Sequence, residues 1–156
     1  MTEIKTVISE QIKKHGKGRD ALMPILQSIV EMNNYLTNEN MVEIAKELDI
    51  SAADVYGTAS FYSFLETEER GRYVIRICKS ITCDMKGKNK IISTIHDILK
   101  IKLGETTQNK KFSLLETNCI GLCDQGPAML INDDYYNRLT PEKVREVLGD
   151  YIRNKN

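Results

Sequence analysis

The residues of this chain with the clearest potential for chemistry are its four cysteines, which fall into two closely spaced pairs. Cys78 and Cys83 form a C-x4-C pattern, and Cys119 and Cys123 form a C-x3-C pattern. Each pair comes at the end of a stretch that is typical of a β-strand, so we expect the two loops to converge on one point. Soft thiolates in a tetrahedral set are suitable ligands for an iron–sulfur cluster or for zinc.

The spacing of the pairs narrows the choice of metal without settling it. Structural zinc sites favour C-x2-C knuckles, and neither pair has that spacing. The C-x2-C-x2-C run of [4Fe–4S] proteins and the C-x4-C-x2-C start of plant-type ferredoxins are both absent. A Rieske site needs two histidines, and His15 and His96 are remote in sequence from both pairs. Two paired loops suit a [2Fe–2S] cluster, while zinc and simple burial of the cysteines remain alternatives.

Some neighbours of the cysteines have two interpretations each. Gly121, inside the second pair, either supplies a positive φ that turns backbone N–H groups toward the sulfurs or is an ordinary loop glycine. Lys79, Lys86 and Lys88 flank the first pair. They either offset the negative charge of a thiolate-bound cluster or are simply solvated.

Composition and charge restrict the class of protein. The 156 residues are 41% hydrophobic and 28% charged, which is typical of a globular chain. Twenty-two basic residues balance 22 acidic ones, which argues against a broad nucleic-acid or anionic-membrane surface. The sequence shows no membrane-spanning run and no signal-peptide core, so we expect a cytoplasmic protein without membrane insertion. Thiols stay reduced in that compartment, which favours metal ligation over disulfides.

The elements that must position the cysteines divide the chain into two parts. Apolar residues recur at helical spacing through the first 65 residues, most clearly from Leu22 to Val30. Thr37 is expected to cap a third helix, and the stretch 51–54 is a capping-box variant that opens a fourth. The charged turn at 66–72 marks the predicted boundary. The predicted domains are therefore a helical bundle over residues 1–67 and a second domain over 68–156.

The second domain is predicted to be a small sheet with packed helices. Residues 72–78, 111–119 and 128–133 have the composition of strands, and 135–139 is expected to be a further short strand. Residues 88–100 carry an apolar helical face, and Thr140 is expected to cap a final helix that begins at Pro141. The predicted order is β-α-β-β-β-α, so the fold class is α/β, preceded by the helical bundle.

Enzymatic motifs are missing from the sequence. No G-x-G-x-x-G follows a predicted strand, and no Walker A pattern is present. Neither histidine has a serine or cysteine partner in a nucleophilic motif. We therefore predict no catalytic residues and no nucleotide site within this chain.

The two cysteine pairs, followed by Gly126, Pro127 and the stretch MLIND, resemble the thioredoxin-like [2Fe–2S] subunit of NADH dehydrogenases. The stretches DVYGTASFYSFL, LGETT and YYNRLTPEKV are similar to other landmarks of that family. The resemblance covers nearly the whole chain and implies a thioredoxin-like [2Fe–2S] ferredoxin domain after the helical bundle. It implies that the cluster ligands are Cys78, Cys83, Cys119 and Cys123. Two positions depart from the family: Ser80 stands where glycine is usual, and Gly126 where alanine is frequent.

The resemblance also implies a function. The chain is expected to transfer single electrons through a [2Fe–2S] cluster, as a subunit beside a flavoprotein that binds FMN and NAD(P). The Ile-, Lys- and Asn-rich composition suggests a soluble, electron-bifurcating iron hydrogenase, with a hydrogenase or other large catalytic subunit as a further partner. The alternative is the equivalent subunit of respiratory complex I. A zinc-stabilised interaction module without a redox role is an alternative of a different class.

Overall fold

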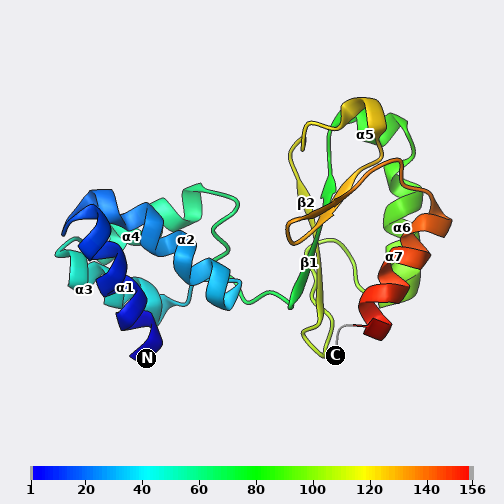
Figure 1. The fold of residues 1–156 in the computed structure, drawn as a ribbon. Helices are drawn as coiled ribbons and strands as arrows, with labels where there is room; N and C mark the ends of the chain where they lie inside the picture. Colours follow the sequence, from blue (N-terminus) through cyan, green and yellow to red (C-terminus); the bar gives the residue numbers. More distant parts are fainter. Residues whose placement is uncertain (1, 155–156) are drawn as a thin grey trace. The chain divides into compact units, whose positions relative to one another are not determined.

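The structure, a computed structural model, describes residues 2–154. The chain divides into two compact units between Arg70 and Gly71, slightly after the boundary that the sequence predicts. Figure 1 shows a helical unit formed by the first part of the chain and a sheet-containing unit formed by the second. No helix in the described range is long and apolar enough to cross a membrane.

The first unit is built from four α-helices and one short 3-10 helix at Arg19–Ala21. Because its apolar side chains recur at helical spacing, they meet in one core, which includes the fully buried Ile25, Leu26 and Ile29. The helices are α1 (Thr2–His15), α2 (Leu22–Asn33), α3 (Asn38–Leu48) and α4 (Ala52–Phe61).

Side-chain caps begin the third and fourth helices, as the sequence predicts. The Asn40 N–H donates to the Thr37 hydroxyl at the start of α3, over 3.1 Å. At the start of α4, the Asp54 N–H donates to the Ser51 hydroxyl, which itself donates to the Asp54 carboxylate over 2.7 Å. Both contacts satisfy donors that a helix leaves unpaired at its first turn. α4 ends at Phe61 because Tyr62 has extended backbone angles.

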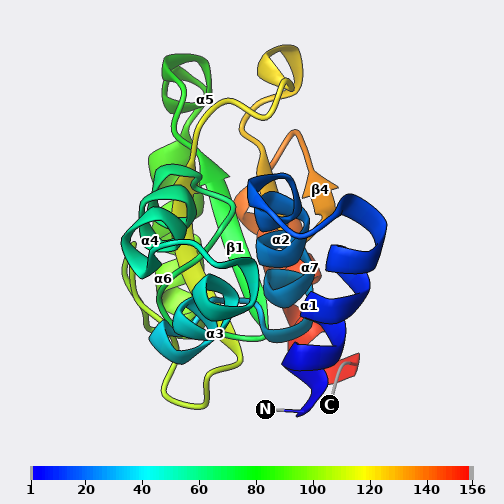
Figure 2. The same cartoon turned by 90° about the vertical axis from the view of Figure 1, so that its left-hand side faces the viewer.

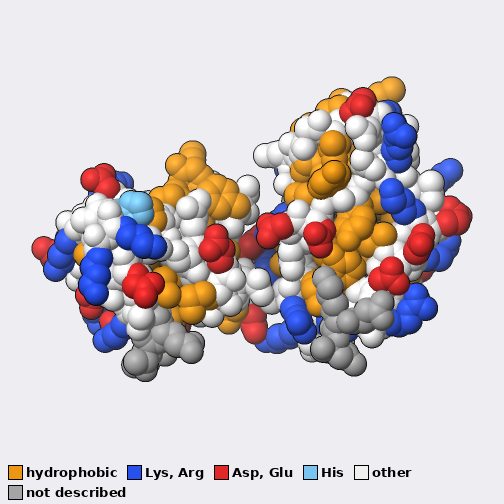
Figure 3. Space-filling model, viewed as in Figure 1, with side chains coloured by type: hydrophobic (Ala, Val, Ile, Leu, Met, Phe, Trp, Pro, Cys, Tyr) orange, Lys and Arg blue, Asp and Glu red, His pale blue; other side chains and the backbone are white. Residues whose placement is uncertain are grey.

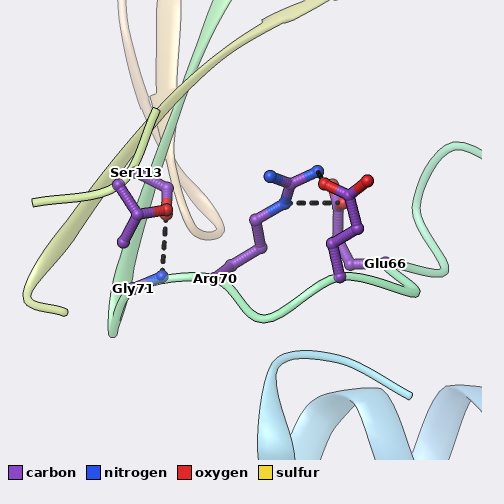
Figure 4. Close-up of polar contacts among 6 residues, drawn as sticks. Glu66, Arg70, Gly71 and Ser113 are labelled. Atoms are coloured by element: carbon purple, nitrogen blue, oxygen red, sulfur yellow. Dashed lines mark hydrogen bonds and ion pairs between the residues drawn. The ribbon is translucent and has the colours of Figure 1, made fainter. Parts of the chain in front are cut away.

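At the boundary between the two units, hydrogen bonds tie the last residue of the first unit and the first residue of the second unit to their respective units (Figure 4). Arg70 donates from Nε to the Glu66 carboxylate over 3.1 Å. The Gly71 N–H donates to the buried Ser113 hydroxyl over 2.7 Å. A Cβ atom at position 71 would lie 2.8 Å from backbone atoms of Phe112, so this close approach requires glycine.

The second unit contains a four-stranded mixed sheet in the order β2-β1-β3-β4. β1 pairs with β2 in parallel, whereas β3 is antiparallel to both β1 and β4. A parallel pair needs a long crossover, and the segment with α6 supplies it. The strands are β1 (Tyr73–Cys78), β2 (Phe112–Thr117), β3 (Met129–Ile131) and β4 (Asp134–Tyr136).

Two helices, α6 (Lys88–Leu99) and α7 (Pro141–Asn154), lie on the same face of this sheet (Figure 1). Their apolar stripes and the strands form a second core, separate from that of the helical unit. Ile75, Ile77 and Leu114 from the strands are fully buried there, beside Ile95 of α6 and Val144 of α7. The unit therefore has a hydrophobic core of its own, which supports a site at its edge.

The predicted order of elements omits one helix. Residues Ile81–Met85 form a short helix, α5, between the first strand and α6. Five residues are too few to show helical periodicity, so only Ser80, which occupies the N-cap position, signals this helix in the sequence. The predicted strands are also slightly too long, since β2 ends at Thr117 and not at Cys119. α7 begins at Pro141, as the sequence predicts, and continues to Asn154.

Candidate metal centre

The first cysteine pair is held by regular secondary structure. Cys78 is the last residue of β1, and Cys83 lies on α5 and not in an open loop as predicted. Both side chains are buried, with 1% of each residue exposed. Ser80 has φ −63° and ψ 150°, which any residue can adopt, so the glycine usual in the family is not needed here.

The second pair lies on an irregular loop between β2 and β3. Cys119 is exposed, and Cys123 begins a 3-10 turn that ends at Gln125. Gly121 has φ +84°, and its N–H donates to the Cys119 Sγ atom over 3.4 Å. Of its two interpretations, the functional one is therefore confirmed: this glycine turns a backbone donor toward a sulfur.

The sheet brings the two loops to one end of the unit, as Figure 2 shows for α5 and the loop that follows β2. The Cys78 N–H donates to the Ala128 carbonyl over 3.1 Å. The Lys79 N–H donates to the Thr117 carbonyl over 2.9 Å. Residues just before and just after the second cysteine loop are thus both bonded to the end of β1. This is why pairs far apart in sequence converge.

The four thiols interact with one another as two pairs. The Sγ atoms of Cys119 and Cys123 are 3.1 Å apart, and all four cysteines are free thiols. A hydrogen bond to Cys119 and repulsion from its charge raise the pKa of the Cys123 thiol above its ordinary value. The charges of Cys78 and Cys83 act in the same direction, so all four thiols are close enough to interact electrostatically.

The environment of Cys78 favours its thiolate. Burial raises the pKa of this thiol, but hydrogen bonds from the Ser80 hydroxyl and backbone N–H act against it. Further hydrogen bonds come from Cys83 and from the backbone of Ile120, and the net pKa lies below its ordinary value. Because Ile120 belongs to the second loop, that loop helps to prepare Cys78 of the first pair for binding a cation.

These residues fit a [2Fe–2S] cluster. The donor set is four free thiols in two pairs, and each iron of such a cluster takes two thiolates. The backbones of Gly121 and Ile120 supply hydrogen bonds to the sulfurs, as expected around an anionic centre. The Cys78 thiol donates to the Ser80 hydroxyl, which can donate to the sulfur once the thiol is ionised. Among the described residues, no three His, Cys, Asp or Glu side chains are gathered into a site for a single metal ion.

Lysines around the first pair have specific partners. Lys86 donates from Nζ to the carbonyls of Cys123 and Asp124, over 3.0 and 2.8 Å. Lys88 forms an ion pair with Glu116 of β2 over 3.2 Å. Lys86 is exposed, as the interpretation of solvated lysines expects, but it has partners; Lys88 is largely shielded by its ion pair. No sequence motif signals either contact, because each depends on the tertiary approach of distant segments.

The histidines stay outside the centre. His15 ends α1 in the helical unit. His96 lies on α6, where its Nδ1 atom is 3.0 Å from the Ile101 carbonyl, so the ring closes the end of that helix.

A mixed sheet with two helices on one face, and two cysteine pairs converging at its end, is an arrangement suited to the ferredoxin class of proteins. The sequence profile of thioredoxin-like [2Fe-2S] ferredoxins matches residues 8–152. The chain belongs to this family, and the family carries a [2Fe–2S] cluster. The resemblance inferred from the sequence and the predicted fold class are thereby confirmed.

Similar proteins cover almost the whole chain. The E subunit of the NADH-quinone oxidoreductase of Aquifex aeolicus (strain VF5) is 33% identical over 149 residues, which are 96% of this chain and 93% of that protein. The E subunit of the same enzyme from Escherichia coli (strain K12) is 35% identical over 147 residues, 94% and 89% of the two chains.

The fold is also found within a longer chain. A chain of an NAD+-reducing [NiFe]-hydrogenase in the H2-reduced state aligns with a TM-score of 0.78 and 22% identity. The alignment covers 90% of this chain but 23% of that chain. At this identity the likeness concerns the fold alone.

Proposed function

We propose that this chain is an electron-transfer subunit that carries one [2Fe–2S] cluster in a multi-subunit, NAD(P)H-linked oxidoreductase. The proposed ligands are Cys78, Cys83, Cys119 and Cys123. The observation that carries the proposal is the convergence of four free thiols, in two pairs, at one end of the sheet. Membership in a [2Fe–2S] family supports the identity of the metal centre.

The cluster supplies the one-electron redox chemistry when bound, and the chain's own residues tune it. Cys78 and Cys83 are shielded from water by burial. Cys119 is exposed, so one side of the centre is within reach of a partner. The Ser80 hydroxyl and the Gly121 N–H lie within hydrogen-bonding range of ligand sulfurs, where they stabilise added negative charge.

The similar proteins change which of the two candidate complexes is the preferred hypothesis. Composition alone favours a soluble, electron-bifurcating hydrogenase over complex I. The curated relatives described above are E subunits of NADH-quinone oxidoreductases and match this chain over most of its length. The hydrogenase likeness is one of fold. We therefore propose a complex I type assembly as the main hypothesis and keep a hydrogenase complex as the second.

The proposed partner is a flavoprotein subunit that binds FMN and NAD(P), in the cytoplasm, with docking mainly by the helical unit. Exposed aromatic side chains gather where α4 ends: Phe61 is 78% exposed, and Tyr62 and Phe64 are also exposed. Figure 3 shows apolar side chains at the surface of this unit. A groove of about 450 Å³ lies beside them, lined by residues that include Arg19, Leu22, Met23, Gly57 and Phe61. Apolar surface of this kind is typical of a protein–protein contact.

Electron transfer tests this proposal directly. The purified chain is expected to be red-brown, with a visible spectrum that dithionite bleaches, whereas NADH alone leaves it oxidised. Adding the flavoprotein subunit of the same organism should allow NADH to reduce it. Reduction by NADH without any flavoprotein contradicts the subunit assignment, and a colourless, zinc-containing chain supports the interaction-module alternative.

A shortened chain tests the division of labour between the units. The second unit has its own core, so a chain that begins at Glu68 should still assemble the cluster with a nearly unchanged visible spectrum. It should bind the flavoprotein subunit much more weakly in a pull-down than the full chain does. Full retention of affinity refutes the docking role of the helical unit.

A further inference from the structure

Lys86 connects the two cysteine loops. It follows α5, which carries Cys83, and its ammonium donates to two carbonyls of the second loop, those of Cys123 and Asp124. The distances, 3.0 and 2.8 Å, are those of charge-assisted hydrogen bonds. One of the two acceptors is the backbone of a proposed ligand. Lys86 therefore joins the end of α5 to the turn on which Cys123 lies, and the Arg138 N–H and the Asn137 side chain bond the other end of that turn at Gln125.

The aliphatic part of Lys86 is also in packing contact. A Cβ atom at Gly126 would lie 3.4 Å from the Lys86 Cδ atom and 3.0 Å from the Cys83 Sγ atom. The lysine stem, the Cys83 sulfur and the glycine backbone are thus packed together. The missing side chain at position 126 leaves room for the stem to pass across to the second loop.

We propose that Lys86 is a positioning residue that clamps the second cysteine loop onto the first. The second loop has no regular structure beyond the 3-10 turn Cys123–Gln125, so its own local hydrogen bonds are few. The Lys86 ammonium satisfies carbonyls at the start of that turn and fixes its distance from α5. With respect to cluster binding, the inference rests on the proposed ligands. The clamp itself is a property of the chain alone.

A second lysine provides a matched control. Lys79 directly follows Cys78 and is exposed, and within the described part of the chain its ammonium makes no hydrogen bond or ion pair. Lys79→Met removes a positive charge next to the same cysteine pair but leaves the clamp intact. Lys86→Met removes both the charge and the clamp, whereas Lys86→Arg keeps the charge and a donor.

Hydrogen exchange of the full-length chain, stripped of metal, tests the clamp independently of any cluster. We expect the amides of residues 119–126 to exchange about threefold faster in Lys86→Met than in the parent, the scale of an exposed ionic contact. Lys86→Arg should restore slow exchange, and Lys79→Met should match the parent. Equal exchange in Lys86→Met and the parent overturns the inference, as does equal acceleration by Lys79→Met.

The loaded protein gives a second readout. Lys86→Met should release its cluster to a chelator about threefold faster than the parent, with Lys79→Met unchanged. The midpoint potential should fall in Lys86→Met and be restored in Lys86→Arg, because a nearby positive charge favours the reduced, more negative state. A parent chain that holds no [2Fe–2S] cluster refutes the proposed function. The proposed role of Lys86 is still supported in that case if hydrogen exchange of residues 119–126 is faster in Lys86→Met and not in Lys79→Met.

Discussion

The two cysteine pairs are positioned by different means. Cys78 and Cys83 lie on a strand end and a helix, are buried, and take their geometry from regular backbone structure. Cys119 and Cys123 lie on an irregular, more exposed loop. That loop is held by contacts from elsewhere, which include the end of β1, Lys86, and Asn137 and Arg138 at Gln125. Local structure therefore prepares one half of the centre, and tertiary contacts prepare the other.

The largest expected effect is common to both pairs. Replacing any of the four cysteines by alanine should abolish stable cluster binding, because one of the two irons then lacks a ligand. The pairs should differ in the metal-free chain. Cys83→Ala should cost about 1 kcal/mol of unfolding free energy because it empties buried space. Cys119→Ala should change stability by less than about 0.5 kcal/mol. Urea unfolding measures both, and equal losses would remove the distinction between the pairs.

The rate of thiol alkylation should be about tenfold or more higher at the exposed Cys119 than at the buried cysteines of the first pair. In the metal-free chain, iodoacetamide reaches the exposed Cys119 directly, whereas Cys78 and Cys83 react only after local opening of the structure. Peptide mass spectrometry after timed alkylation gives the rate at each cysteine. If Cys83 is modified as fast as Cys119, the first pair is not preformed in the metal-free protein.

Replacing either of two glycines of the second loop by alanine should lower the stability of the protein, for a different reason in each case. Gly126 has ordinary backbone angles, but its added Cβ atom meets the Cys83 sulfur at 3.0 Å. Gly121 has open space around it but a φ of +84°. Each change should cost about 1 kcal/mol, by crowding and by backbone strain respectively.

Spectroscopy of the loaded protein distinguishes these two causes. Only Gly126→Ala pushes on a ligand sulfur of the first pair, so it should change the visible circular dichroism of the cluster more than Gly121→Ala does. An identical, unperturbed spectrum in Gly126→Ala would show that Cys83 yields without moving the metal centre.

The smallest effect is expected at Ser80. Its hydroxyl lies 3.3 Å from the Cys78 Sγ atom and donates to the thiolate form of that residue. Ser80→Ala should lower the midpoint potential slightly, since a hydrogen bond to a ligand sulfur favours the reduced cluster. Redox titration followed by visible absorbance measures the shift. A rise in potential would contradict this role of the hydroxyl.

Much of the fold is predictable from the sequence because its signals are local. Thr37 and Ser51 cap helices as expected, and apolar periodicity identifies the stripe of α2 and the core face of α6. The sequence analysis does not predict α5, because five residues are too few to show helical periodicity. Ser80 at its N-cap position is the sequence signal that indicates this helix. Periodicity likewise cannot fix element ends, such as that of β2 at Thr117.

In the candidate site, too, the local features can be predicted from the sequence and the tertiary contacts cannot. Spacing alone identifies the four cysteines and the loop that carries the second pair, but not the helix α5 that carries Cys83. The hydrogen bonds of Lys86 to Cys123 and Asp124 join residues 37 and 38 positions apart, so no local pattern contains them. The close approach of Gly126 to Cys83 is equally a tertiary property. Sequence reasoning therefore finds the proposed ligands, while the residues that arrange them become visible only in the folded chain.

Metal and sulfide analysis of the full chain, purified without oxygen, tests the central claim most directly. Four thiolates that hold two irons in pairs predict about two iron atoms and about two acid-labile sulfides per chain, with no zinc. One zinc per chain without sulfide would contradict the assignment of these four cysteines to a [2Fe–2S] cluster.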